Sequence, residues 1–265
     1  MTTLTSTRPP VPAATPSRTL AMIERNFMIY RRSLTPLLSA MVEPVLYLVS
    51  IGIGVGMLIG DVAGVHVRYP AWVAPAILAT TAMNTAFNQT SFGVFSRIRA
   101  ERTYEAILPT PVSVTDIACA EVASAVINAV LTSIGFVVVM AVAGLVTSPA
   151  VLLAIPASIL VGFAFAAGGL AVTTFLRDFA DFQYIQLVML PMYLFATTFY
   201  PLSTYPAPLR PVIEVLPLYQ SIQLIREPAL GAAGWSQLLS VAYLAAFGVA
   251  AMWIAVRRMT RIMLS

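Results

Sequence analysis

Six long apolar stretches constrain the fold of this chain more than any other feature. They lie at residues 37–60, 71–95, 117–146, 150–176, 182–200 and 236–256. Each holds roughly 18 or more mostly apolar residues, enough for a helix to cross a hydrocarbon core about 30 Å thick. The sequence therefore predicts an all-α membrane protein with six transmembrane helices.

The arginines orient these helices. The chain has no lysine, and twelve of its fifteen arginines fall in alternate gaps between the apolar stretches. These twelve are Arg8, Arg18, Arg25, Arg31, Arg32, Arg97, Arg99, Arg102, Arg177, Arg257, Arg258 and Arg261. Short loops rich in arginine stay on the cytoplasmic side. We therefore expect a multi-pass protein of the cytoplasmic (inner) membrane with both termini in the cytoplasm.

Composition excludes several classes of function. The net charge of +4 comes from cations at the membrane borders rather than on one basic face, so membrane lipid and not nucleic acid is the expected partner. A single cysteine, Cys119, excludes a disulfide within the chain and a cysteine metal cluster. Without lysine there is no P-loop, so any ATP and Mg²⁺ must be bound by another polypeptide. We expect no catalytic residue, cofactor or metal in this chain.

The first residues differ from the rest. Residues 1–17 are rich in Thr, Pro and Ala and predict a disordered cytoplasmic tail, which leaves 18–265 as the transmembrane domain. Apolar residues recur at helical spacing over 18–33, opposite charged ones, and this predicts an amphipathic helix in the headgroup plane. Its candidate interfacial residues are Arg25, Phe27, Arg31 and Arg32. The alternative is an early start to the first span.

Polar side chains inside the apolar stretches are candidates for a transport pathway. Glu43 is expected about two turns from the cytoplasmic end of its span, where it either reaches back toward Arg31 or Arg32 or makes a helix contact that moves during transport. Asn84, Asn88 and Gln89 are amides in the second span, and the first two share a face. Whether they join helices or line a path stays open. Glu121 is expected to be shallow enough to meet water.

The gap at 96–116 is the densest charged segment, with apolar residues interleaved among the charges. Pro109 and Pro111 end any helix there, and Asp116 is placed to cap the next span. The pattern predicts a short helix that docks a cytoplasmic subunit; an ordinary solvated loop is the alternative. The candidate coupling residues are Arg97, Arg99, Glu101, Arg102, Thr103, Tyr104 and Glu105.

Prolines interrupt residues 200–230, so no piece of this segment is long enough to span a bilayer. We expect short re-entrant or interfacial helices at the outer face, packed against protein. The candidate residues of this segment are Tyr200, Pro201, Pro217, Tyr219 and Gln220.

Three sets of residues carry a family resemblance. The first set is Arg25-Asn26-Phe27 with Glu43-Pro44 and the glycines at 52, 54 and 56. The second set is residues 102–108 with Thr110–Ser113 and Asp116-Ile117. The third set is Phe199–Leu202 with Leu216–Leu218 and Leu224–Arg226. In this order the chain resembles the permease subunit of ABC-2 type exporters over roughly 20–260, nearest the nodulation-factor (NodJ-like) branch.

The resemblance implies a six-span subunit that dimerises with itself or with a paralogous permease and binds two copies of a nucleotide-binding ATPase subunit. It implies that the loop after the second span holds the coupling helix, that the helix near 18–33 also contacts the ATPase, and that the proline-rich segment forms outer re-entrant helices. The chain departs from relatives at Ala196-Thr197-Thr198, where they often have Gly, and at Gln220 and Gln223, where they often have His and Asp. The loss of titratable groups favours a less charged cargo.

We therefore expect the permease subunit of an ATP-driven exporter that moves an amphiphilic cargo: a drug, a lipid or a lipid-linked glycan. An ion-gradient-driven secondary transporter is one alternative, and it would need titratable residues near the bilayer centre. The others are a membrane enzyme, for which no acid, base or metal set is evident, and a non-catalytic membrane assembly subunit.

Overall fold

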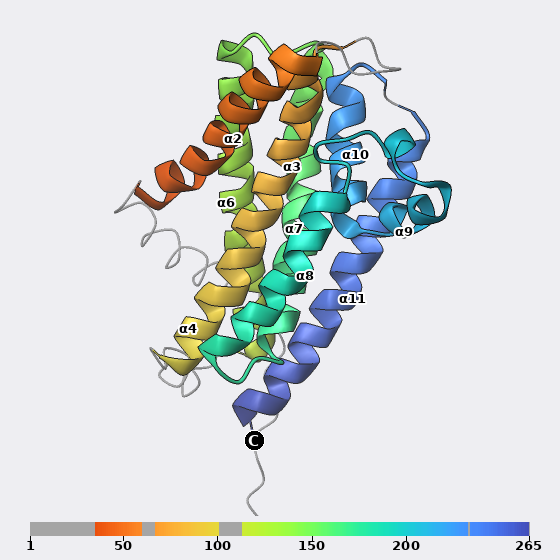
Figure 1. The fold of residues 1–265 in the computed structure, drawn as a ribbon. Coiled ribbons are helices and arrows are strands. Elements are labelled where there is room, and N and C mark those ends of the chain that lie inside the picture. The colour runs from red at the N-terminus through yellow and green to blue at the C-terminus, as the bar shows by residue number, and fades with distance from the viewer. Residues whose placement is uncertain (1–34, 60–66, 101–112, 233, 265) are drawn as a thin grey trace, which may run out of the picture.

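The computed structural model describes residues 35–59, 67–100, 113–232 and 234–264. Every regular element among them is helical, and the helices form one bundle (Figure 1), as the sequence predicted. The predicted tail at 1–17, the predicted interfacial helix at 18–33 and the coupling residues Glu101 to Glu105 lie outside the described residues.

The long helices are α2 (Thr35–Ile59), α3 (Tyr69–Asn88), α6 (Val114–Val142), α7 (Ala154–Thr173), α8 (Phe182–Phe195) and α11 (Ser236–Leu264). A π-helix, η1 (Gln89–Gly93), and the short α4 (Val94–Arg99) continue α3 toward one end of the bundle. The remaining short elements are η2 (Pro149–Leu153), η3 (Phe179–Asp181), η4 (Leu202–Thr204), η5 (Ala207–Leu209), α9 (Arg210–Glu214) and α10 (Pro217–Ala229).

Four segments in the described part of the chain are long and apolar enough to cross a membrane: Met41–Leu58, Val114–Val142, Pro149–Thr173 and Ser236–Ile262. The predicted stretch at 71–95 is helical, but its threonines and asparagines lower its hydropathy. The predicted stretch at 182–200 is helical only to Phe195, and its 14-residue helix is about 21 Å long, less than a bilayer core. The count of six spans therefore stays a prediction.

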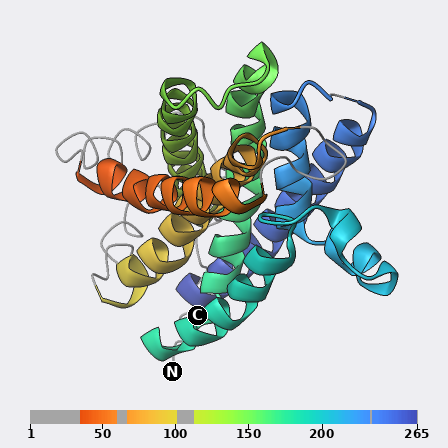
Figure 2. The ribbon, with the colours of Figure 1, turned by 45° about the horizontal axis from the view of Figure 1, so that its top comes forward.

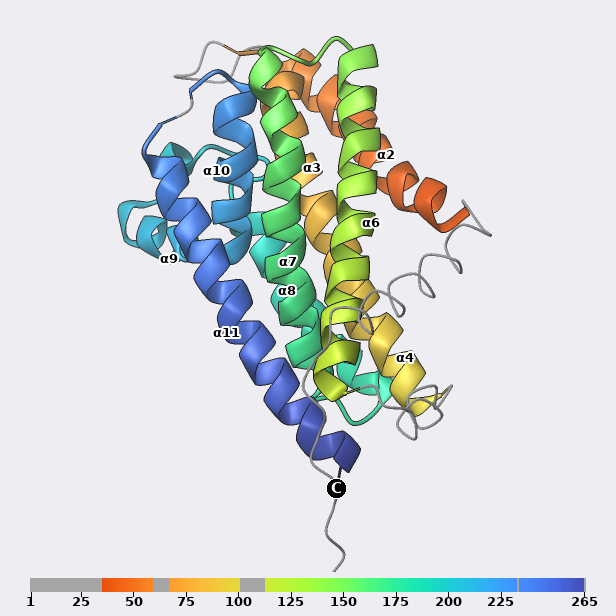
Figure 3. The ribbon, with the colours of Figure 1, turned by 180° about the vertical axis from the view of Figure 1, so that it is seen from behind.

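The core of the bundle is built around α7, which packs against α3, α6, α10 and α11 (Figure 3). Small residues on α7 allow close approach: a Cβ added at Gly162 would lie 3.2 Å from the Ala129 Cβ of α6. The start of α6 is a capping box in which the Asp116 backbone N–H donates to Ser113 Oγ and the Ser113 N–H donates to the Asp116 carboxylate. The N-cap is therefore Ser113, and Asp116, which the sequence predicted as the cap, completes the capping box from the third helical position.

Two features of the arrangement shape the candidate site. Helix α2 crosses the bundle obliquely, against α3 and α6 (Figures 1 and 2). Helix α8 occupies the half of the bundle nearer the C-terminus, and α10 occupies the other half (Figures 1 and 3). The chain passes from α8 to α10 through the turn that follows Phe195 and then through η4, η5 and α9.

Candidate functional site

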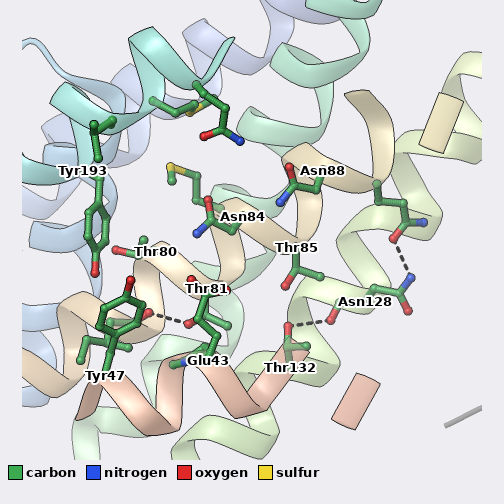
Figure 4. Close-up of a pocket in the computed structure, with 17 residues that line it drawn as sticks. Glu43, Tyr47, Thr80, Thr81, Asn84, Thr85, Asn88, Asn128, Thr132 and Tyr193 are labelled. Atoms are coloured by element: carbon green, nitrogen blue, oxygen red, sulfur yellow. Dashed lines mark hydrogen bonds between the residues drawn. The ribbon is translucent and has the colours of Figure 1, made fainter. Parts of the chain in front are cut away.

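A cavity of about 540 Å³ lies between α2, the α3–η1 segment, α6 and α8 (Figure 4). Ligand pockets for drug-sized molecules have volumes of about 300–1,000 Å³. The cavity wall contains Glu43, Asn84, Asn88 and Gln89, so the structure brings together all four candidate pathway residues.

Amide side chains form one wall of the cavity. Asn84 and Asn88 are exposed on it and lie on the same side of α3 (Figure 4). Gln89 Oε1 accepts a hydrogen bond from Asn128 Nδ2 of α6 at 2.7 Å. Gln89 therefore joins two helices and lines the cavity as well, whereas Asn84 and Asn88 present their amides to its interior.

The amide wall ends in the π-helix η1, which α7 holds in place. The Thr173 hydroxyl, which has one proton to donate, lies 3.0 Å from the Thr90 carbonyl oxygen and 3.1 Å from that of Ser91, and also 2.9 Å from that of Gly169 in its own helix. A Cβ on Gly169 would lie 2.5 Å from Thr90 Oγ1 and 2.7 Å from the Phe87 carbonyl oxygen, so only glycine allows this approach. Single-turn π-helices inside α-helices occur frequently at functional sites.

The opposite part of the wall carries two tyrosines and a carboxylate. The rings of Tyr47 on α2 and Tyr193 on α8 lie 6.5 Å apart between centroids, and they point toward each other across the cavity (Figure 4). Glu43 lines the same cavity as Thr80 and Thr81, near the middle of α3. Glu43 is exposed and lies about two turns from the start of α2 at Thr35, which is the position along the helix that the sequence predicted.

At the end of the bundle that holds α4, Arg97 donates to the Glu121 carboxylate of α6. Glu121 is fully buried, so the expectation that it meets water is wrong. Its charge is instead balanced across the α4–α6 contact. Arg99 is exposed at the end of α4.

The loop between α7 and α8 packs against the same end of α4. The Phe95 ring lies 5.0 Å from that of Phe179 and 5.4 Å from that of Phe182. The backbone N–H groups of Arg177 and Asp178 donate to the Asp181 carboxylate and hold the pKa of this exposed group below its usual range. Hydrogen bonds to Asp181 thus fix the conformation of the loop, and its phenylalanines pack it against α4, the helix that leads to the predicted coupling residues.

The candidate residues of the proline-rich segment mostly serve its packing. Pro217 occupies the first turn of α10. Gln220 Nε2 donates to the Glu214 carbonyl oxygen, and Gln220 Oε1 accepts from Ser240 Oγ, both at 2.7 Å, so this side chain joins α10 to α9 and α11. The Tyr219 hydroxyl accepts from Gln223 Nε2 at 3.0 Å. Tyr200 is exposed and Pro201 is half-buried, next to η4.

The residue that the sequence analysis missed is Arg226. Its guanidinium lies 3.8 Å from the Trp72 ring centroid and donates to the Thr197 carbonyl oxygen at 2.8 Å. Nearby, the Tyr69 hydroxyl donates to the Phe199 carbonyl oxygen at 3.1 Å. These contacts hold the turn after α8 against α3 and α10. The only available signal was the arginine at the end of the Leu224-Ile225-Arg226 motif.

Comparison with known proteins identifies the family. The family model described as ABC-2 type transporter matches residues 17–230. The chain belongs to this family. It is 35% identical to nodulation protein J of Rhizobium meliloti over 214 residues, which are 80% of this chain and 81% of that protein. It is 33% identical to nodulation protein J of Sinorhizobium fredii over 254 residues, which are 95% and 96% of the two chains. The ABC-2 chain is thus similar to these transporters over most of its length, and it is a membrane permease of this family.

Proposed function

We propose that this chain is the transmembrane subunit of an ATP-driven exporter of amphiphilic molecules in the cytoplasmic membrane. The observation that carries the proposal is the cavity between α2, α3, α6 and α8, whose amides and hydroxyls line a space inside an otherwise apolar bundle. A polar cavity at this position gives a polar headgroup an environment that the lipid around the helices cannot supply.

The remaining lining suits the apolar part of such a cargo. Met83 on α3 and Met189 and Leu190 on α8 lie in the same cavity as Asn84 and Asn88. Thioether side chains adapt to different shapes, so this side accepts apolar groups without a fixed geometry. The cavity therefore matches an amphiphile better than it matches an ion or a wholly polar solute.

We propose that two copies of a nucleotide-binding ATPase subunit, with ATP and Mg²⁺, drive transport, and that the permease dimerises with itself or with a paralogous permease. The coupling helix near Arg102 and Glu105 would move with the ATPase. Its motion would reach the cavity through α4 and η1, which continue directly into the amide wall on α3. ATP binding can bias the pathway only if the two conformations differ in their contact with the ATPase.

A secondary transporter driven by an ion gradient is the second candidate, because the Glu43 carboxylate of α2 lines the cavity. A carboxylate inside a membrane span is a group that proton or cation coupling can use. Family membership favours the ATP-driven mechanism. Transport into inverted vesicles separates the two: dissipating the ion gradient abolishes secondary transport, whereas the exporter continues as long as ATP is supplied.

The decisive experiment is reconstitution with a nucleotide-binding ATPase subunit, sought first among the reading frames next to the gene for this chain. We expect the two proteins to co-purify and amphiphilic compounds to stimulate ATP hydrolysis. Reversing the charge of Arg102 or Glu105 should abolish the stimulation while the protein still inserts, and Arg68→Glu, in a different gap, should leave stimulation intact. Normal transport by both coupling variants would show that the docking assignment is wrong.

A further inference from the structure

The described residues leave the charge of the cavity unbalanced. Glu43 is the single charged side chain among the described residues that line it, although the chain holds fifteen arginines. Glu43 makes no hydrogen bond or ion pair with the residues described. A carboxylate within a membrane span is costly unless it is paired or faces water. A bound cation would remove that cost, whereas an anionic headgroup would be repelled.

The groups around Glu43 match one kind of cation. Tyr47 and Tyr193 line the same cavity, with their ring centroids 6.5 Å apart and their ring planes inclined at 52° (Figure 4). The π-face of a tyrosine attracts an ammonium group within about 6 Å of the ring centroid. A carboxylate beside two tyrosine rings is therefore suited to an alkylated ammonium, which needs charge and ring faces more than hydrogen-bond acceptors.

The other walls would hold the remainder of such a molecule. Asn84 and Asn88 supply neutral polar contacts, and Met83, Met189 and Leu190 supply apolar ones. A volume of about 540 Å³ is that of a site for a drug-sized molecule.

We propose that this cavity selects amphiphiles with a cationic, ammonium-type headgroup, held by the Glu43 carboxylate and the faces of Tyr47 and Tyr193. The inference rests on the transport function proposed above and names the class of its cargo. It also refines the expectation of a less charged cargo: the headgroup carries one positive charge and no negative charge.

Binding to two matched probes tests the proposal. The full chain, assembled with its ATPase in nanodiscs of zwitterionic phosphatidylcholine, is titrated with a dansyl-tagged alkyl chain that ends in trimethylammonium, and separately with the isostere that ends in tert-butyl. The lipid then adds no net charge that would concentrate the cation. Wild type should bind the cationic probe at least about tenfold more tightly, as expected for a cation held by a carboxylate and two aromatic rings.

Variants assign the preference to residues. Glu43→Gln should bring the affinity ratio close to one while leaving the affinity for the tert-butyl probe unchanged. Tyr193→Leu should weaken binding of the cation by about tenfold, and Tyr193→Phe, which keeps the ring, should not. Glu214→Gln removes an exposed carboxylate away from the cavity and serves as the charge control. Equal affinity for the two probes, binding of neither, or a preference that survives Glu43→Gln would overturn the proposal.

A transport measurement distinguishes this failure from failure of the proposed function. If the complex transports both probes equally in an ATP-dependent manner, the exporter stands and the charge selectivity is wrong. If ATP drives transport of neither probe and no ATPase co-purifies, the exporter itself is wrong.

Discussion

Arg226 is a buried cation on α10 that contacts no carboxylate among the described residues. Its guanidinium stacks on Trp72 and donates to the Thr197 carbonyl oxygen. Thr197 has φ of +61°, which an L-residue other than Asn or Asp rarely adopts. We infer that Arg226 stabilises this unusual turn.

Lysine at this position should not replace arginine. Arg226→Lys keeps the charge but loses the planar stack and the guanidinium fork, and it should lower the free energy of unfolding by about 2 kcal/mol. The measurement is the thermal unfolding midpoint of the detergent-solubilised protein. Arg210→Lys is the matched control, because Arg210 also donates to two backbone carbonyl oxygens, those of Tyr205 and Ser203, but is exposed. Equal midpoints for the two variants would contradict this account of Arg226.

Sequence reasoning at this scale succeeds where the information is local. The four-residue spacing of Asn84 and Asn88 places both on one face of a helix, and both line the cavity. That Glu43 lines one cavity with residues of α3 could not be predicted, because this depends on the oblique crossing of α2. Arg226 could not be given a role, because Trp72 and Thr197 reach it from distant parts of the chain.

The π-helix η1 is an element that depends on its neighbour. The sequence of η1 carries no signal that separates it from an ordinary helical turn. The π-helix is held because the Thr173 hydroxyl lies within hydrogen-bond distance of its carbonyl oxygens and Gly169 lets α7 approach. Local propensity can therefore predict a helix over this segment, but the helix type follows from packing.

Two adjacent glycines of α7 test this dependence. A Cβ on Gly169 would overlap Thr90 and Phe87, so Gly169→Ala should push α7 away from η1 and destabilise the protein by about 1–3 kcal/mol. A Cβ on Gly168 would meet the Phe247 ring at 3.6 Å, an ordinary contact, so Gly168→Ala should leave the unfolding midpoint unchanged or raise it slightly. Equal effects of the two substitutions would show that η1 does not depend on this contact.

Helix α8 shows a second limit of sequence reasoning. Its apolar stretch predicts a span over 182–200, yet the helix stops at Phe195. The residues after it are apolar or neutral, so hydropathy does not mark the end. The helix ends because Thr197 adopts a positive φ and its carbonyl oxygen accepts a hydrogen bond from Arg226. In the half of the bundle that α8 does not reach, its place is taken by α10 (Figure 1).

At the scale of the whole molecule, the two ends of the bundle differ in their arginine content. The described arginines of the three arginine-rich gaps gather at one end of the bundle: Arg97, Arg99, Arg177, Arg257, Arg258 and Arg261. Two of these arginines also contact side chains or helix ends of neighbouring helices there. Arg97 pairs with Glu121, and Arg258 donates to the Thr174 hydroxyl while its guanidinium lies over the Phe175 ring. Arginines that the sequence analysis used only to predict orientation therefore also join helices: Arg97 joins α4 to α6, and Arg258 joins α11 to the end of α7.

If arginine sets the orientation, the end that carries it faces the cytoplasm, and cysteine labelling can test this. In a Cys119→Ser background, Ala180→Cys lies in the loop between α7 and α8, and Ala207→Cys lies in η5; both positions are exposed. A membrane-impermeant maleimide should label position 207 in intact cells and position 180 only after permeabilisation. The background protein without cysteine controls for labelling elsewhere. The reverse pattern would place the coupling segment outside the cell, where no ATP-hydrolysing partner could reach it, and both the orientation and the proposed mechanism would fail together.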